Sequence, residues 1–166
     1  MSKVITFSTK FPSYHPKAGQ PTFFIEKIWA SFHEKFPHKD IEDKYCFVNG
    51  SKDSFWDIFG TYEPKYHTVR AGNRWKVGDK FSPRAWTGKP YNSKQLTFAP
   101  DLEIKKTWEI ETNGNLFFIN GKALSVIDTV QLANNDGLLR LDFYDWFKMP
   151  SAFSGQIICW SNKIEY

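Results

Sequence analysis

The chain has 166 residues, a formal net charge of +4 and 18% aromatic residues, which suits a single domain with ample apolar material for one core. It holds two cysteines without a CxxC pair, and it has no apolar run long enough for a signal sequence or a membrane span. These features argue against a disulfide-rich secreted scaffold and a membrane-spanning protein. We therefore expect a cytoplasmic protein without a membrane partner.

The positive charge is concentrated in one block of the sequence. Residues 65–94 contain eight basic side chains and one acidic side chain, Asp79. Residues 1–64 are balanced, with eight of each sign, and residues 95–166 carry six basic and nine acidic side chains. A local basic block beside aromatic residues is typical of proteins that bind phosphate or nucleic acid. An ordinary solvated loop is the alternative interpretation.

The first part of the chain predicts one strand followed by helices. Residues 4–7 predict a short strand. Residues 22–36 carry phenylalanine and isoleucine four apart, the apolar stripe of an amphipathic helix, and a proline ends it. Residues 51–62 predict a second short helix that a glycine closes. Together, residues 13–62 form a helical excursion after the first strand.

The second part of the chain predicts mostly strands. We expect strands at residues 66–72, 79–86, 102–113, 115–120, 122–128 and 155–160. Asn113-Gly114 and Asn120-Gly121 predict hairpin turns, since both dipeptides accept positive φ angles.

Two helices are expected before the last strand. Asp128 and Gln131 suggest a capping box that opens a helix at 129–136, and Gly137 suggests its C-cap. A second helix, at 142–148, begins at Asp142. The predicted fold class is α+β: a single domain over residues 1–166, built as a small mixed or antiparallel β-barrel decorated with helices. Residues 65–127 and 156–160 would supply the barrel.

Several common catalytic and cofactor motifs are absent from the sequence. The four histidines form no HExxH motif, and no GxxxxGK[ST], GxGxxG or GxSxG motif occurs. We therefore predict neither a metal site nor a cofactor.

The stretch PKYHTVRAGNRWKVGD, residues 64–79, offers the strongest candidate site. Side chains alternate along a strand, so Thr68 and Arg70 share one face. Lys65 follows a proline at the entrance of the strand, where the chain can bend toward Thr68. A desolvated lysine loses its proton more easily and could remove the hydroxyl proton of a threonine. Alternatively, Thr68 is a simple β-former and Lys65 an exposed strand end.

These residues resemble the signature of the ASCH family, a branch of the PUA-like barrel superfamily. Lys65, Thr68 and Arg70 match its K-x-x-T-x-R strand, and VGD at 77–79 matches the turn that closes the following hairpin. LANNDGL and DFYDWF, at 132–138 and 142–147, resemble its two later helices. The resemblance covers residues 64–160, and residues 1–11 can supply the first strand. The excursion at 13–62 is longer than in the smallest members.

The resemblance implies two kinds of function. Some bacterial members are amidohydrolases that remove the acetyl group from the exocyclic amine of acetylated cytidine, using Lys, Thr and Glu. Here Thr68 would be the nucleophile, Lys65 its base, and Asp136, one methylene shorter, would stand at the glutamate position. We expect Lys65, Thr68, Arg70 and Asp136 to face one cavity; a solvated Asp136 before a glycine cap is the alternative.

Other members of the superfamily bind RNA without hydrolysis. The substrate- or RNA-binding candidates here are Arg70, Arg74, Trp75, Lys76 and Trp86, because cations meet phosphates and exposed indoles stack on bases. Core packing is the alternative for the two tryptophans. The expected partner is a modified nucleoside or RNA, and a protein-interaction domain that uses the excursion is a third possibility. The sequence predicts neither the natural substrate nor the oligomeric state.

Overall fold

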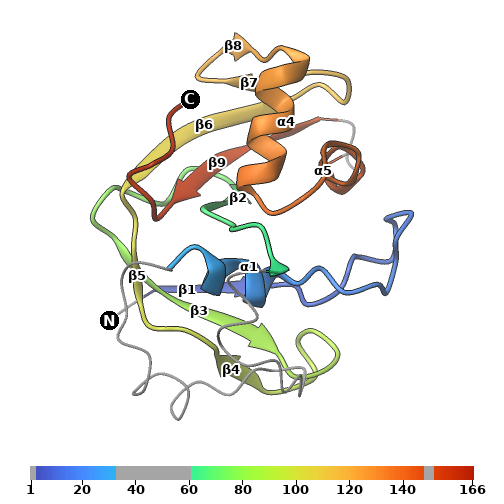
Figure 1. The fold of residues 1–166 in the computed structure, drawn as a ribbon, viewed down its shortest axis with the longest axis vertical. Helices are drawn as coiled ribbons and strands as arrows, with labels where there is room; N and C mark the ends of the chain where they lie inside the picture. The colour runs from blue at the N-terminus through green and yellow to red at the C-terminus, as the bar shows by residue number, and fades with distance from the viewer. Residues whose placement is uncertain (1–2, 33–60, 148–151) are drawn as a thin grey trace.

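The computed structural model describes residues 3–32, 61–147 and 152–166. These residues form nine strands and three helices, and the strands make two sheets that lie one above the other in Figure 1. The α+β class is therefore confirmed. Within these ranges, no helix combines the length and apolar character needed to cross a membrane.

The lower sheet in Figure 1 is built around a parallel pair. Its strands are β1 (Lys3–Phe7), β3 (Lys80–Trp86), β4 (Gln95–Thr97) and β5 (Leu102–Glu103). β1 runs parallel to β3, and β4 and β5 pair with β3 antiparallel. Helix α1 (Phe24–Ala30) packs Ile25, Ile28 and Trp29 into the same core cluster as this sheet, and Trp29 is fully buried. Its first residue, Phe24, belongs to the second core cluster.

The upper sheet is antiparallel throughout and has the strand order β2-β9-β6-β7-β8. Its strands are β2 (His67–Ala71), β6 (Lys106–Thr112), β7 (Phe117–Ile119), β8 (Lys122–Ala123) and β9 (Phe153–Cys159). Helices α4 (Val126–Asn135) and α5 (Arg140–Phe147) contribute to the second core cluster with this sheet. The β6–β7 and β7–β8 turns hold Gly114, Asn120 and Gly121 at positive φ angles, as the two predicted hairpins require.

The prediction of one continuous strand at residues 102–113 is wrong, because the structure divides these residues between the two sheets. Residues 102–113 were expected to be continuous, but β5 pairs in the lower sheet and β6 in the upper. Between them, the Ile104 N–H donates to the carbonyl of Asp79 and the Lys105 N–H to that of Cys159, so the backbone crosses from one sheet to the other. The strands of the described residues form these two sheets and not a closed barrel.

The helix predictions fail at their first residues. Ser125, not Asp128, is the N-cap of α4: its hydroxyl accepts from the Asp128 N–H while the Asp128 carboxylate accepts from the Ser125 N–H. The strand predicted at 122–128 is therefore limited to Lys122–Ala123, and its last three residues form the first turn of α4. Helix α5 likewise starts at Arg140 rather than Asp142. Most of the helix predicted at 51–62 lies outside the described residues.

Candidate functional site

The site is assembled where the C-terminus of α4 meets the chain entering β2. Three consecutive carbonyls at this helix end receive hydrogen bonds: Asn135 from the Tyr66 N–H, Asp136 from Lys65 Nζ at 2.5 Å, and Gly137 from Lys27 Nζ at 2.7 Å. A cation is favourable at a helix C-terminus, where carbonyls lack intrahelical partners. Residue 65 is thus pulled inward and is buried, so the interpretation of Lys65 as an exposed strand end is wrong.

Lys65 and Asp136 form a buried ion pair. Lys65 Nζ lies 2.8 Å from Asp136 Oδ1, and the two side chains are 1% and 6% exposed. Nζ also lies 4.3 Å from the centre of the Phe24 ring, a cation–π distance. The alternative of a solvated Asp136 is therefore wrong. The aspartate side chain, although shorter than a glutamate, reaches the lysine here.

Gly137 makes this close approach possible. It has a φ angle of 76°, and its N–H and that of Leu138 bond back to Asn134 and Ala133, which completes a Schellman motif. A Cβ at this position would lie 3.2 Å from side-chain carbons of both Lys27 and Lys65. The glycine before LLR in the sequence is thus needed for its conformation and for its small size.

A second buried residue, His67, faces Asp136 from β2. His67 Nδ1 lies 3.3 Å from Asp136 Oδ1, within ion-pair distance but outside hydrogen-bond geometry. On the other side of the ring, Nε2 lies 2.7 Å from the Tyr166 hydroxyl, which accepts from Asn135 Nδ2 at 2.9 Å. The hydroxyl proton is then free to point at Nε2, which assigns the ring proton to Nδ1, facing the carboxylate.

The charge states follow from burial and from this pairing. Burial lowers the pKa of Lys65 to about 8, although Asp136 acts in the opposite direction. Burial alone would raise the pKa of Asp136, but the charge of Lys65 and the contact with His67 outweigh it and hold the pKa below its ordinary value. Burial also lowers the pKa of His67. Lys65 therefore gives up its proton at a lower pH than an exposed lysine does.

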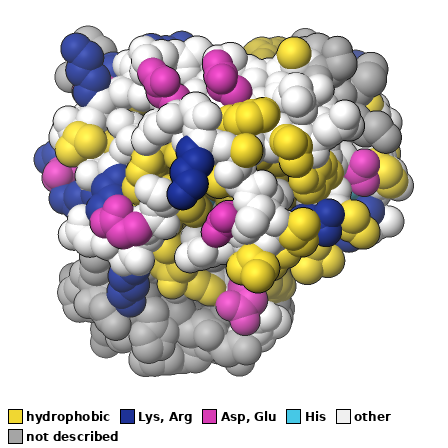
Figure 2. Space-filling model, turned by 90° about the horizontal axis from the view of Figure 1, so that it is seen from above, with side chains coloured by type: hydrophobic (Ala, Val, Ile, Leu, Met, Phe, Trp, Pro, Cys, Tyr) yellow, Lys and Arg dark blue, Asp and Glu magenta, His cyan; other side chains and the backbone are white. Residues whose placement is uncertain are grey.

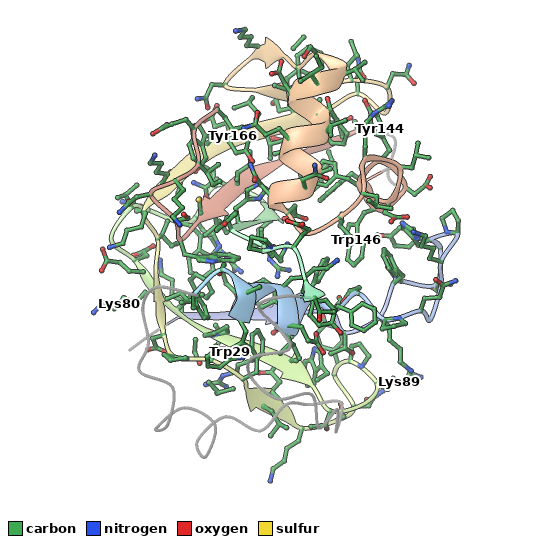
Figure 3. The ribbon with its side chains drawn as sticks, in the orientation of Figure 1. Trp29, Lys80, Lys89, Tyr144, Trp146 and Tyr166 are labelled. Atoms are coloured by element: carbon green, nitrogen blue, oxygen red, sulfur yellow. The ribbon has the colours of Figure 1, made fainter. Side chains whose placement is uncertain are left out.

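Thr68 and the ion pair border one small cavity, here called the inner cavity, of about 40 Å³. Its lining includes the four residues expected to converge, Lys65, Thr68, Arg70 and Asp136, together with Phe24 and Trp146. Figure 3 labels Trp146, which comes from α5. The volume holds roughly three water molecules. The Thr68 hydroxyl makes no hydrogen bond with any other described side chain, so it remains available to a ligand.

A larger depression, here called the outer groove, adjoins the inner cavity. It has a volume of about 460 Å³ and is bordered by Thr6, Ser8, Arg70, Arg74, Trp86 and Tyr91, among others. Ser8 and Arg70 border both spaces. Arg70 Nη2 donates to the Thr6 carbonyl at 2.7 Å, so this side chain connects β2 of the upper sheet with β1 of the lower.

The other predicted binding residues lie in different environments. Arg74 and Trp86 border the outer groove, Arg74 being exposed and Trp86 half-buried. Trp75 is only 3% exposed and packs in the lower core, so its proposed stacking on a base is wrong and the core alternative is right. Lys76 is exposed and borders neither space; its backbone N–H donates to Asp79, which shapes the Gly-Asp turn.

The sequence did not predict three residues near the site, namely His67, Tyr166 and Tyr91. His67 lies within the K-x-x-T-x-R stretch, but its contact with Tyr166 joins residues 99 positions apart, and no sequence signal links the two. Tyr91 had a signal, because it stands in a Gly/Pro/Asn/Ser-rich turn five residues after Trp86, where an exposed aromatic is unusual. Among the described residues, no three His, Cys, Asp or Glu side chains converge as a metal site would require.

Comparison with known proteins gives no independent assignment. No protein-family model, no curated protein and no solved structure matches the chain.

Proposed function

We propose that the chain is an ASCH-type domain of the PUA-like superfamily that hydrolyses the amide formed on the exocyclic amine of an acylated nucleobase, with acetylated cytidine as the model substrate. One observation carries the proposal: a buried lysine–aspartate pair and an available threonine hydroxyl share a small cavity that adjoins a groove of ligand size. The motif K-x-x-T-x-R at residues 65–70 supports the assignment.

The chemistry requires Lys65 in its neutral form. Neutral Lys65 accepts the Thr68 hydroxyl proton while Thr68 Oγ1 attacks the amide carbonyl carbon. The tetrahedral intermediate then collapses, the C–N bond breaks, and the lysine ammonium returns the proton to the leaving exocyclic amine. Water, deprotonated by neutral Lys65, next attacks the carbonyl carbon of the acyl-threonine ester. The bond between that carbon and Thr68 Oγ1 breaks, the lysine ammonium returns its proton to Oγ1, and the carboxylic acid is released. Asp136 holds the lysine amine in place through its carboxylate and its carbonyl.

The dimensions of the two spaces agree with this division of the substrate. A cavity of about 40 Å³ has room for an acetyl group but not for a nucleobase. The outer groove, at about 460 Å³, falls in the size range of small-molecule sites. The acyl group would enter the inner cavity while the base and sugar remain in the groove.

The test is incubation with a panel of acylated cytidines, followed by chromatography for free cytidine. We expect release of cytidine by the wild type, its loss in Thr68→Ala, and its partial retention in Thr68→Ser, which keeps the hydroxyl. Melting temperatures of both variants should stay close to that of the wild type, which shows that the loss is chemical. A wild type that is inert on every member of the panel contradicts the proposal.

A non-catalytic nucleoside- or RNA-binding module is the second candidate. The observation that favours it is the complete engagement of Lys65 with Asp136, since a lysine that caps α4 has a structural role without catalysis. For an RNA polymer, the affinity should fall steeply with salt as counterions are released. Arg74→Glu should make the affinity for RNA less dependent on salt concentration. An affinity that does not change with salt would exclude RNA polymers as partners.

A further inference from the structure

The outer groove is lined by two cations and, among the described residues that border it, by no acid. Arg70 and Arg74 both reach it, whereas Asp136 borders only the inner cavity. Burial, and secondarily the neighbouring charge of Arg74, lowers the pKa of Arg70 to about 10 although Asp136 acts against this. Arg70 therefore stays charged at neutral pH, and the charged residues that border the groove are both positive.

Two residues of the groove also carry buried hydrogen-bond donors without acceptors. Neither Nε of Arg70 nor Nε1 of Trp75 has a hydrogen-bond partner in the part of the chain that the structure describes. Buried N–H groups are normally paired, so each of these two groups has the capacity to donate to a further acceptor, such as an oxygen of a ligand. A ligand that brings acceptor oxygens and negative charge would meet both needs.

The lining of the groove also includes two aromatic side chains, Trp86 and Tyr91. The rings of Trp86 and Tyr91 lie 5.4 Å apart, centre to centre, and Tyr91 is 89% exposed. Tyr91 also has a φ angle of 64°, a left-handed conformation that is unfavourable for a residue with a Cβ. An exposed aromatic held in this way beside cations is suited to stacking on a flat heterocycle.

We propose that the outer groove binds a single nucleotide, with its phosphate on Arg74 and the free edge of Arg70 and its flat ring on Trp86 and Tyr91. The substrate of the hydrolysis would then be a phosphorylated nucleoside rather than a free one. This choice of nucleobase rests on the proposed function, but recognition of the phosphate does not. A single nucleotide fits better than a strand, because the groove has a volume of about 460 Å³, within the range of small-molecule sites. On the face shown in Figure 2, which views the molecule from above, lysines and arginines are dispersed among acidic and hydrophobic side chains.

The experiment measures binding without hydrolysis, by calorimetry with unacylated ligands. The probes are cytidine, cytidine 5′-monophosphate, cytidine 3′-monophosphate and an eight-residue oligocytidine. The variants are Arg74→Gln and, as the matched control, Lys122→Gln. The control removes one positive charge from an exposed position on β8 of the upper sheet, and this residue borders neither the groove nor the inner cavity. We expect one monophosphate to bind about tenfold or more tightly than cytidine, the value of a charge-assisted contact.

Arg74→Gln should reduce that preference, because Arg70 alone then contacts the phosphate, and Lys122→Gln should preserve it in full. Equal affinities for cytidine and both monophosphates, no binding of any of them, or a preference that survives Arg74→Gln in full would overturn the inference. An oligonucleotide that binds far more tightly than either monophosphate would also overturn it in favour of a strand. A wild type that binds the monophosphate but hydrolyses no acylated cytidine refutes the proposed function and leaves this inference standing.

Discussion

Breaking the Lys65–Asp136 ion pair should lower the free energy of unfolding far more than breaking an exposed ion pair does. The two charged atoms are 2.8 Å apart and the side chains are 1% and 6% exposed. Removal of one partner leaves the other charge desolvated and unpaired, which costs about 3–5 kcal/mol in a buried pair. We therefore expect Lys65→Met and Asp136→Asn each to lower the free energy of unfolding by about that amount at pH 7.

The double variant distinguishes pairing from simple loss of contacts. With both charges removed, no uncompensated ion remains, so its cost should fall short of the sum of the two single costs by about 2–3 kcal/mol. Urea unfolding followed by tryptophan fluorescence measures all three values.

The control is the ion pair between Lys17 and Asp142. Its atoms are equally close, at 2.7 Å, but its lysine side chain is 39% exposed. Lys17→Met should cost less than about 1 kcal/mol, because exposed pairs contribute little. Additive losses for Lys65→Met and Asp136→Asn, or losses no larger than that of the control, would refute the reasoning.

Three further outcomes are expected. Hydrolysis should rise with pH and level off above about 8, since only neutral Lys65 acts as a base; a rate that falls between pH 6 and 8 would contradict this. Tyr166→Phe removes the hydroxyl that joins His67 to Asn135, and the unpaired buried groups should lower the free energy of urea unfolding by about 1–3 kcal/mol. Gly137→Ala should lower the melting temperature more than Gly72→Ala, because both glycines have positive φ but only Gly137 has lysine carbons within 4 Å; equal shifts would remove the crowding argument.

The contributions of Lys65 and Asp136 to the free energy of unfolding also depend on pH, and the direction of each change follows from the direction of its pKa shift. The pKa of Lys65 is lower in the folded chain, so the unfolded chain binds this proton more tightly below pH 10.5. Its unfavourable contribution is complete below about pH 8 and disappears as the pH rises to 10.5. The pKa of Asp136 is lowered, so its favourable contribution is present above its ordinary value and is lost as the pH falls through the folded value.

Local patterns in the sequence predict elements well but their boundaries poorly. The hairpins at Gly114 and Gly121 were predictable because few residues accept their φ angles. The start of α4 was not, because Ser125 and Asp128 are both good caps and only the structure shows that they cap reciprocally. The division of 102–113 between two sheets depends on hydrogen bonds to Asp79 and Cys159, which are distant in sequence.

For the site, the sequence indicated which residues meet but not how deeply they are buried. The resemblance predicted that Lys65, Thr68 and Asp136 face one cavity, and all three line the inner cavity. Burial of Lys65 depends on the end of α4 some 70 residues later, and burial of Trp75 on packing against β1 and β3. Both are tertiary effects that alternation along one strand cannot reveal.

The depth at which Lys65 is buried is itself an argument for a chemical role. Capping of α4 does not require a fully buried lysine, since Lys27 reaches the next carbonyl from a half-buried position. A desolvated ammonium is costly, and burial has moved the pKa of Lys65 to about 8, close to neutral pH. Groups with strongly shifted pKa values cluster at functional sites. In the proposed reaction, the inner cavity, which Lys65 and Thr68 both line, would supply space for a reacting group and a nucleophile within the same enclosure.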